Sequence, residues 1–188
     1  MSWKVDYSHS QIQFSARHMM IATVRGQFDK FTVEAEIDEK DVTQSRLEVQ
    51  IDAASINTKA EQRDNHLRSP DFFNSKEYPY ITFTSKRGVR LDENHGKLIG
   101  DLTIRDATKE VALDVEFLGR AKSPWGTQNA GFSARAKVNR KDWGLNWNVA
   151  LETGGWLVSD EVTIDIEIEF VQVPEPVKAE PVAQAVAA

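Results

Sequence analysis

The chain has 188 residues, a length typical of one domain, with 40% hydrophobic and 28% charged residues, as in ordinary globular proteins. The absence of cysteine excludes disulfides and zinc–thiolate sites, and fits a reducing compartment. The formal net charge of −6 argues against nucleic acid as a partner, because non-specific binding to nucleic acid needs an excess of Lys and Arg.

The first part of the chain predicts three closely spaced strands, over residues 3–9, 11–18 and 23–37. In the third, Val24 and Phe28 lie on one face of the expected strand. Phe31 and Val33 lie on the other face. We expect a β-bulge near residues 26–30 to reconcile the two faces, because a glycine inside a strand often marks a bulge.

A long connection follows a strand predicted over residues 47–52. Residues 57–69 are polar and compatible with a helix. Pro70 then begins a turn that ends in two adjacent aromatic residues, Phe72 and Phe73. We expect one short helix here, which could lie across one end of the fold.

The second half of the chain alternates between apolar and polar residues, in segments 97–105, 111–117, 132–138 and 162–170. Loop residues at 92–96 and 106–109 separate the first segments as in hairpins. Strands with one dry and one wet face are typical of antiparallel sheets. About eight or nine such strands need a shared interior, which a sandwich or a closed barrel would supply. The scarcity of helix and the long strands favour an antiparallel β-barrel.

Both ends of the chain carry simple signals. The start does not resemble a signal peptide, and no apolar run is long enough to span a membrane. We therefore expect a cytoplasmic protein with no stable membrane insertion. Residues 173–188 lack aromatic side chains and have little to bury, so we expect a disordered tail after a barrel domain over residues 1–172.

Catalytic and metal-binding patterns are absent from the sequence: it has no phosphate-binding loop and no zinc-protease motif. We predict no catalytic residues, no metal and no cofactor. His18 shares a face with Phe14, so its ring either contacts a ligand head group or bonds to a backbone carbonyl. Met19, Met20 and Ile21 follow as an adaptable apolar contact surface or as ordinary core.

Seven short motifs, in order, resemble the YceI-like family of lipid-binding proteins over residues 3–171. They are VRGQF at 24–28, SINT at 55–58, RDNHLRSPDFF at 63–73, YPYITFTS at 78–85, GDLTI at 100–104, NRKDWGL at 139–145 and SDEV at 159–162. The resemblance implies a lipocalin-like barrel of about eight strands around a hydrophobic tunnel. It also implies a long-chain lipid as ligand, such as an isoprenoid quinone or a polyprenyl-type amphiphile.

We therefore predict non-catalytic binding, carriage or sequestration of such a lipid. Burial of each CH₂ group is worth about 0.8 kcal/mol before the cost of ordering the chain, so a long tail supplies affinity without polar contacts. The predicted ligand-binding residues are Phe14, His18, Met19, Met20, Ile21, Val24, Phe28, Leu67, Phe72, Phe73, Phe83, Leu102, Phe132 and Trp143.

Three alternatives stay open from the sequence. An isomerase or cyclase could act on a lipid in the tunnel with His18 as acid or base. An interaction protein could have the same strands around a filled core. Exposed strand edges also leave a homodimer open.

Overall fold

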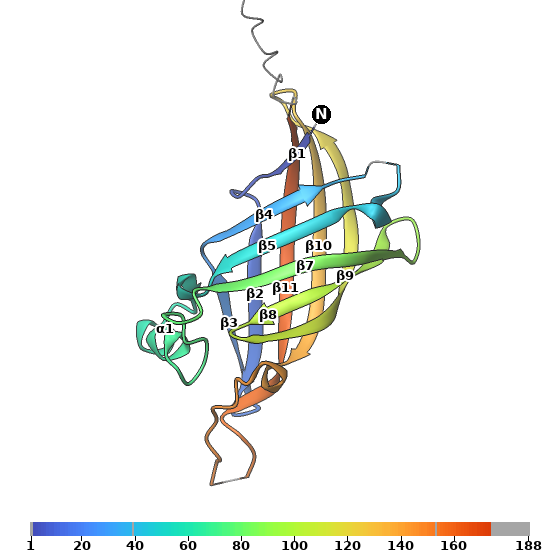
Figure 1. Ribbon diagram of the computed structural model, residues 1–188. Helices are drawn as coiled ribbons and strands as arrows, with labels where there is room; N and C mark the ends of the chain where they lie inside the picture. The colour runs from blue at the N-terminus through green and yellow to red at the C-terminus, as the bar shows by residue number, and fades with distance from the viewer. Residues whose placement is uncertain (1, 39, 153, 174–188) are drawn as a thin grey trace, which may run out of the picture.

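The computed structural model describes residues 2–38, 40–152 and 154–173. It is a long, curled antiparallel sheet with one α-helix beside its lower half (Figure 1). The strands are β1 (Ser2–Val5), β2 (Gln11–His18), β3 (Ala22–Phe28), β4 (Phe31–Glu36), β5 (Arg46–Asp52), β6 (Ile56–Asn57), β7 (Tyr80–Arg90), β8 (His95–Ile104), β9 (Ala107–Lys122), β10 (Gln128–Asn139) and β11 (Val158–Val173). The helix is α1 (Glu61–Arg68), and three 3₁₀ turns are η1 (Val42–Gln44), η2 (Ala53–Ser55) and η3 (Arg140–Trp143).

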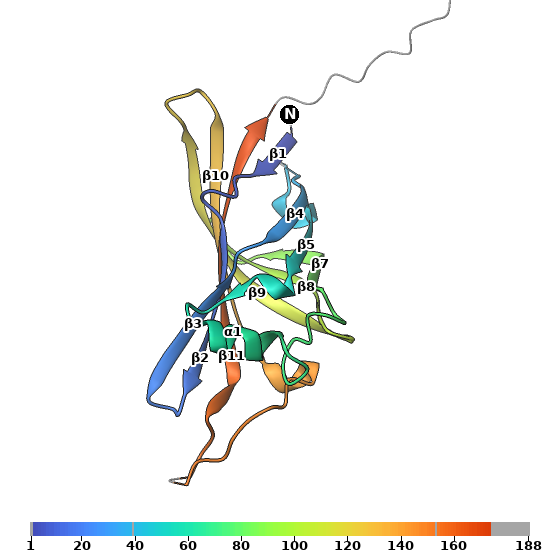
Figure 2. The same cartoon turned by 90° about the vertical axis from the view of Figure 1, so that its left-hand side faces the viewer.

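The strands form one sheet in the order β4-β5-β7-β8-β9-β10-β11-β2-β3-β6, and β1 pairs with β11 beyond the end of β2. The sheet curls into a half-barrel, and Figure 2 shows β2, β3 and β10 on one side of it and β4, β5 and β7 on the other. The predicted all-β antiparallel fold is confirmed. The described residues form eleven strands rather than about eight, partly because residues 23–37 divide into two strands and β6 has only two residues.

The single bulged strand predicted over residues 23–37 is wrong. The segment forms β3 and β4, which are consecutive in the chain and lie far apart in the sheet order. The link between them is held by Ser55, whose carbonyl oxygen accepts the Asp29 N–H at 3.1 Å and whose Oγ accepts the Lys30 N–H at 3.1 Å. The change of face that suggested a bulge is therefore a crossing from one edge of the sheet to the other.

This crossing leaves a gap between β4 and the strands at the other side of the half-barrel. No hydrogen-bonded ladder joins β4 to β1, β2 or β3 in the part of the chain that the structure describes. Instead, the Val33 N–H donates to Tyr7 Oη at 3.2 Å, and the Tyr7 ring meets the Phe31 ring edge-on at 5.6 Å. Side chains rather than a ladder tie these two edges together.

The predicted short helix in the long connection is confirmed as α1. Its Asp64 side chain is buried and accepts hydrogen bonds from the Thr58 backbone N–H at 2.9 Å and from Thr58 Oγ1 at 2.5 Å. Arg68 donates to the carbonyl oxygens of Ala54 and Ile56 at 2.7 and 2.8 Å. These contacts fix α1 against residues 54–58, which include β6, beside the lower half of the sheet (Figure 2).

The predicted tail falls outside the described residues, except that Val173 belongs to β11. None of the helices in the described ranges combines the length and the apolar character needed to cross a membrane.

Candidate functional site

The inner face of the half-barrel is apolar on most of its strands. On β11, Ile164 and Ile166 lie opposite Phe14 and Ile12 of β2, whereas Asp165 between them pairs in an ion bridge on the outer face. Because side chains alternate between faces along a strand, the same pattern repeats on β5, β8, β9 and β10. The period of two in the sequence therefore becomes one continuous apolar lining.

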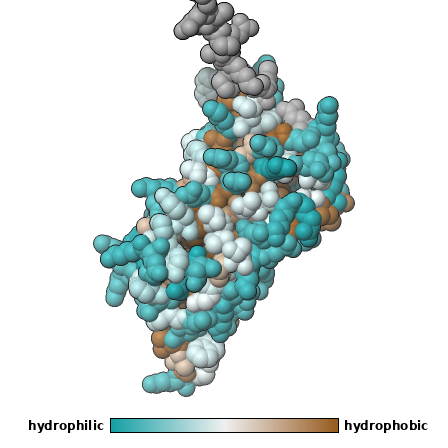
Figure 3. Space-filling model, in the orientation of Figure 1, coloured by the Kyte–Doolittle hydropathy of each residue, from teal (hydrophilic) through white to brown (hydrophobic). Residues whose placement is uncertain are grey.

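This lining encloses a cavity of about 700 Å³. Ligand pockets commonly measure about 300–1,000 Å³, so the space suits a small molecule or a lipid chain rather than a macromolecule. In Figure 3, apolar side chains show between polar ones in the upper half of the molecule, over β4 and β5.

Aromatic side chains close the lower part of the cavity. Trp143 is only 2% exposed, and its Nε1 donates to the Leu102 carbonyl oxygen at 3.0 Å, so its one polar group is satisfied. Phe28 contacts Phe14 and Phe73 with ring centroids 5.7 and 5.9 Å apart. We call these four rings, Trp143, Phe28, Phe14 and Phe73, the aromatic floor of the cavity.

Arg140 also lies at this floor and is 4% exposed. Its guanidinium donates to the carbonyl oxygens of Leu145, Trp147 and Ser159, and pairs with Asp160 at 3.4 Å. Burial lowers the pKa of Arg140, and the Asp160 charge opposes that shift. The guanidinium is engaged by backbone and by Asp160, which gives it a structural role below the cavity.

The other part of the cavity boundary is polar. We call it the charged rim. It lies where the β4–β5 connection meets the β7–β8 hairpin, and η1 packs so closely on β7 that a Cβ at Gly88 would lie 2.8 Å from Thr43 Cα. Three of its residues are paired locally: Lys97 Nζ lies 2.5 Å from Asp114 Oδ1, and His95 Nδ1 lies 2.9 Å from Asp92 Oδ1. The charged rim consists of Asp38, Lys40, Arg46, Arg90, Asp92, Glu93, His95 and Lys97.

Nine of the fourteen predicted ligand-binding residues line the cavity. They are Phe14, Phe28, Leu67, Phe72, Phe73, Phe83, Leu102, Phe132 and Trp143. Ligand contact itself stays a prediction for all fourteen.

Five of the fourteen lie outside the cavity lining: His18, Met19, Met20, Ile21 and Val24. His18 is the last residue of β2, and the chain then turns back through Met19 and Met20, whose φ angles are 51° and 61°. Ile21 is 81% exposed at this turn. The alternation of β2 correctly indicated an inner face, but the last β2 residue that lines the cavity is Ala16, and His18 and the turn after it lie beyond that point.

Sequence reasoning left two groups out of the predicted site. The aliphatic residues of the inner face carried the right signal, their alternation, and many more of them line the cavity than were selected. The charged rim carried only turn signals, which indicate a surface loop. The added aliphatic lining includes Ile12, Val33, Leu47, Val49, Ile51, Ile81, Leu98, Leu113, Val115, Ala134, Ile164, Ile166 and Ile168.

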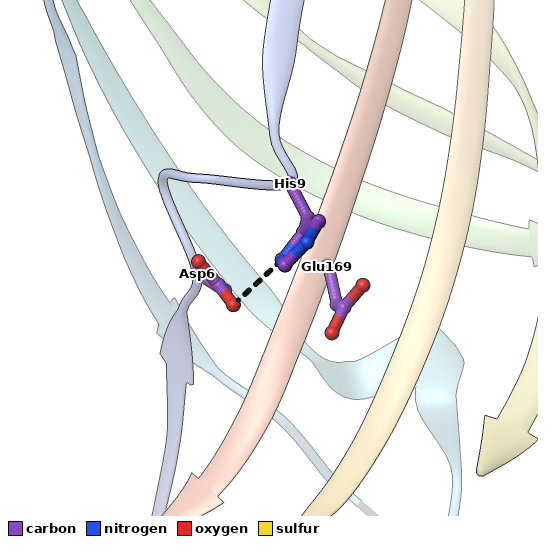
Figure 4. A group of neighbouring side chains, drawn as sticks. All are labelled: Asp6, His9 and Glu169. Atoms are coloured by element: carbon purple, nitrogen blue, oxygen red, sulfur yellow. Dashed lines mark hydrogen bonds and ion pairs between the residues drawn. The ribbon is translucent and has the colours of Figure 1, made fainter. Parts of the chain in front are cut away.

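A cluster of Asp6, His9 and Glu169 is the one group with metal-ligand chemistry among the described residues, and Figure 4 shows it beside β11. His9 Nδ1 lies 3.0 Å from Asp6 Oδ2, and Ser8 Oγ donates to Asp6 Oδ1 at 2.5 Å. The Ser8 and His9 contacts lower the pKa of Asp6 to about 2, and Asp6 raises the pKa of His9. The Glu169 carboxylate accepts a bond from Asn129. These bonds account for the cluster as the closure of a surface turn between β1 and β2.

A model of the YceI-like domain matches residues 3–170 of the chain. The chain belongs to the YceI-like family. It is 41% identical over 166 residues to a UPF0312 protein of Staphylococcus aureus (strain MSSA476), covering 88% of this chain and 94% of the relative. Family membership, which the sequence motifs predicted, is thereby confirmed.

Solved structures with this fold include a Campylobacter jejuni YceI protein, 34% identical, with a TM-score of 0.73 over 84% of this chain and 90% of that one. Burkholderia cenocepacia BcnA is 24% identical, with a TM-score of 0.74 over 88% of this chain and 99% of that one. A polyisoprenoid-binding domain from Saccharophagus degradans is 16% identical, with a TM-score of 0.63 over 93% and 99% of the two chains. The last two likenesses speak for the fold alone.

Proposed function

We propose that this protein binds one long-chain apolar amphiphile in its cavity and carries or sequesters it without chemical change. The observation that carries the proposal is the continuous apolar lining of a cavity of about 700 Å³, bounded by an aromatic floor and a charged rim. An open apolar cavity of this kind argues against the alternative of an interaction protein with a filled core.

The proposed ligand class is an isoprenoid quinone or a polyprenyl-type lipid. The fold is shared with the Saccharophagus degradans domain named for polyisoprenoid binding, which makes this class the first to test. β9 and β11 have 16 residues each. At about 3.3 Å per residue, a strand of that length is longer than an extended tail of several isoprene units. The tail would lie along the apolar lining and the head group near the charged rim.

The alternative of an isomerase or cyclase relied on His18, which does not line the cavity. His95 is the histidine among the lining residues. It lies in the exposed β7–β8 hairpin and is paired with Asp92. Neither the His18 nor the His95 ring is placed to exchange a proton with a lipid tail that lies against the aromatic floor. We therefore retain non-catalytic binding as the proposal.

Uptake of a long-tailed isoprenoid quinone tests the proposal. The quinone, added to delipidated protein, is expected to co-elute with the protein in gel filtration at a stoichiometry near one, measured by the absorbance of the quinone ring, because the apolar cavity of about 700 Å³ holds one tail. The matched probe is the same quinone ring without its tail, which is expected to bind at least about 100-fold more weakly because it buries few CH₂ groups. Equal affinity for the two probes, or no saturable uptake, would overturn the proposal.

The finer predictions, namely a quinone rather than another lipid, a role in transport or stress response, and a homodimer, stay predictions.

A further inference from the structure

Two loops at the lower end of the molecule carry far less charge than the rest of the chain. They are the β2–β3 turn, residues 18–22, and the described part of the loop before β11, residues 147–152 and 154–157. We call them together the apolar tip. Between them they contain one charged residue, Glu152, whereas 28% of the whole chain is charged. Figure 1 shows both loops projecting at the end of the sheet opposite the β9–β10 hairpin.

Large apolar side chains of the apolar tip are exposed. The exposed fractions are 40% for Met19, 59% for Met20, 81% for Ile21, 46% for Val149 and 51% for Trp156. Single exposed apolar residues are common on protein surfaces, but a contiguous group marks a contact surface.

The backbone beneath these side chains is fixed rather than loose. The Met19 N–H donates to the Leu157 carbonyl oxygen at 2.8 Å, and the Leu157 N–H donates to the Val149 carbonyl oxygen at 2.9 Å. Met19 and Met20 both adopt left-handed backbone conformations, which cost a non-glycine residue free energy. The exposed apolar side chains of the tip therefore stand on a hydrogen-bonded and partly strained backbone rather than on a loose loop.

We infer that the apolar tip docks on the surface of a lipid bilayer. The lower end of the molecule tapers (Figure 3), which suits insertion into a soft surface better than packing against a flat protein face. Tryptophan and other apolar side chains favour the membrane interface. Lys141 Nζ, which pairs with Asp160 at 2.8 Å, lies 5.9 Å from the Trp156 ring centre.

The apolar tip is also continuous with the cavity lining. Ala16 and Val158 line the cavity, and Val158 pairs with His18 at the start of the tip. A bilayer in contact with the tip would therefore lie next to the lower part of the cavity. The inference goes beyond the proposed function and is separable from it, because a protein with an empty cavity keeps the tip.

Flotation with neutral phosphatidylcholine vesicles tests the inference on the full chain. The wild type is expected to float with the vesicles, and added salt is expected to leave the bound fraction unchanged, because the one charged residue of the tip is acidic. The double variant Met20→Asn/Ile21→Ser is expected to lose binding by about ten-fold or more. Asn is tolerated at a left-handed position, so this variant is expected to fold.

The matched control is Trp125→Ser in the β9–β10 hairpin at the opposite end, where the side chain is 88% exposed. It is expected to float like the wild type. The inference is overturned if the wild type does not float, if salt releases it, or if the control variant loses as much binding as the tip variant. It is also overturned if the tip variant instead abolishes self-association of the chain in sedimentation.

These outcomes are distinguishable from failure of the proposed function. Lipid uptake with no flotation contradicts docking alone, and flotation with no uptake contradicts the cavity ligand alone.

Discussion

The cavity floor and the apolar tip lie at the same end of the molecule and are built from similar side chains in opposite environments. Trp143 is 2% exposed and closes the floor, whereas Trp156, only 13 positions along the chain, is 51% exposed at the tip. The difference lies in the backbone: Trp143 is a buried residue of η3, whereas Trp156 lies in the loop before β11, where its backbone pairs with Ala150 in an isolated bridge. Apolar composition alone therefore does not say whether a segment faces a ligand, the core or a membrane.

The largest expected difference is in the stability of the two variants Trp143→Ala and Trp156→Ala. Trp143→Ala is expected to lower the free energy of unfolding by about 3–5 kcal/mol, because it removes a buried ring and leaves the Leu102 carbonyl without its donor. Trp156→Ala is expected to stay within about 0.5 kcal/mol of the wild type. Urea denaturation followed by circular dichroism measures both.

The vesicle binding of the same two variants should reverse this order. Trp156→Ala is expected to weaken flotation, and a folded fraction of Trp143→Ala is expected to retain it. Equal losses of stability in the two variants would contradict the contrast between floor and tip.

Two glycines allow the tightness of packing on the inner face of the sheet to be compared with that on the outer face. A Cβ at Gly100 would lie 2.5 Å from the Thr84 carbonyl oxygen and 2.5 Å from the Phe83 ring, which lines the cavity. Gly100→Ala is therefore expected to cost about 1–3 kcal/mol of stability by overpacking. At Gly131 the nearest atom, Leu118 Cβ, is 3.5 Å away.

The control Gly131→Ala is expected to be neutral or to stabilise by up to about 1 kcal/mol, because alanine restricts the unfolded chain. Thermal denaturation of the two variants side by side provides the measurement. A larger loss at Gly131 than at Gly100 would show that the close approach at Gly100 does not limit packing.

The smallest expected effect belongs to the surface turn of Asp6 and His9, which lies away from both the floor and the tip. The pKa of Asp6 is lowered from 3.8 to about 2, so its contribution is present above pH 3.8 and is lost as the pH falls toward 2. The pKa of His9 is raised above 6.5, so its contribution is present below pH 6.5 and is lost as the pH rises through the raised value. The turn is therefore tightest between about pH 4 and 6.5.

Nuclear magnetic resonance titration of the His9 ring is the measurement for this turn. The His9 pKa is expected to fall toward 6.5 in Asp6→Asn, with lipid uptake unchanged. A His9 pKa that Asp6→Asn leaves in place would mean that the Asp6 contact does not hold the turn.

The sequence predicted the parts of this molecule that follow from local periodicity. Alternation on β5, β8 and β11 indicated one dry face, and that face lines the cavity. It did not predict that residues 23–37 divide at Asp29, because two strands in different sheet positions and one bulged strand have the same pattern of apolar residues. Nor did it predict the outward position of Ile21, because alternation carries no information beyond the residue where a strand turns.

The charged rim was missed for a different reason. Arg90 and Lys97 reach the cavity boundary because the β7–β8 hairpin folds back beside η1, a contact between segments about 45 residues apart in the sequence. Short-range patterns in the hairpin signal only a turn. Close packing at Gly88 is what brings the two segments together.

Native mass spectrometry of the purified full chain tests the central claim most directly. The wild type is expected to carry one long-chain lipid that organic extraction removes. Ala134→Trp, which places a large ring in the cavity lining, is expected to lose that lipid, whereas Ala112→Trp on the exposed face of β9 is expected to keep it. A wild type that neither carries nor takes up a lipid, or equal occupancy in the two variants, would contradict the account.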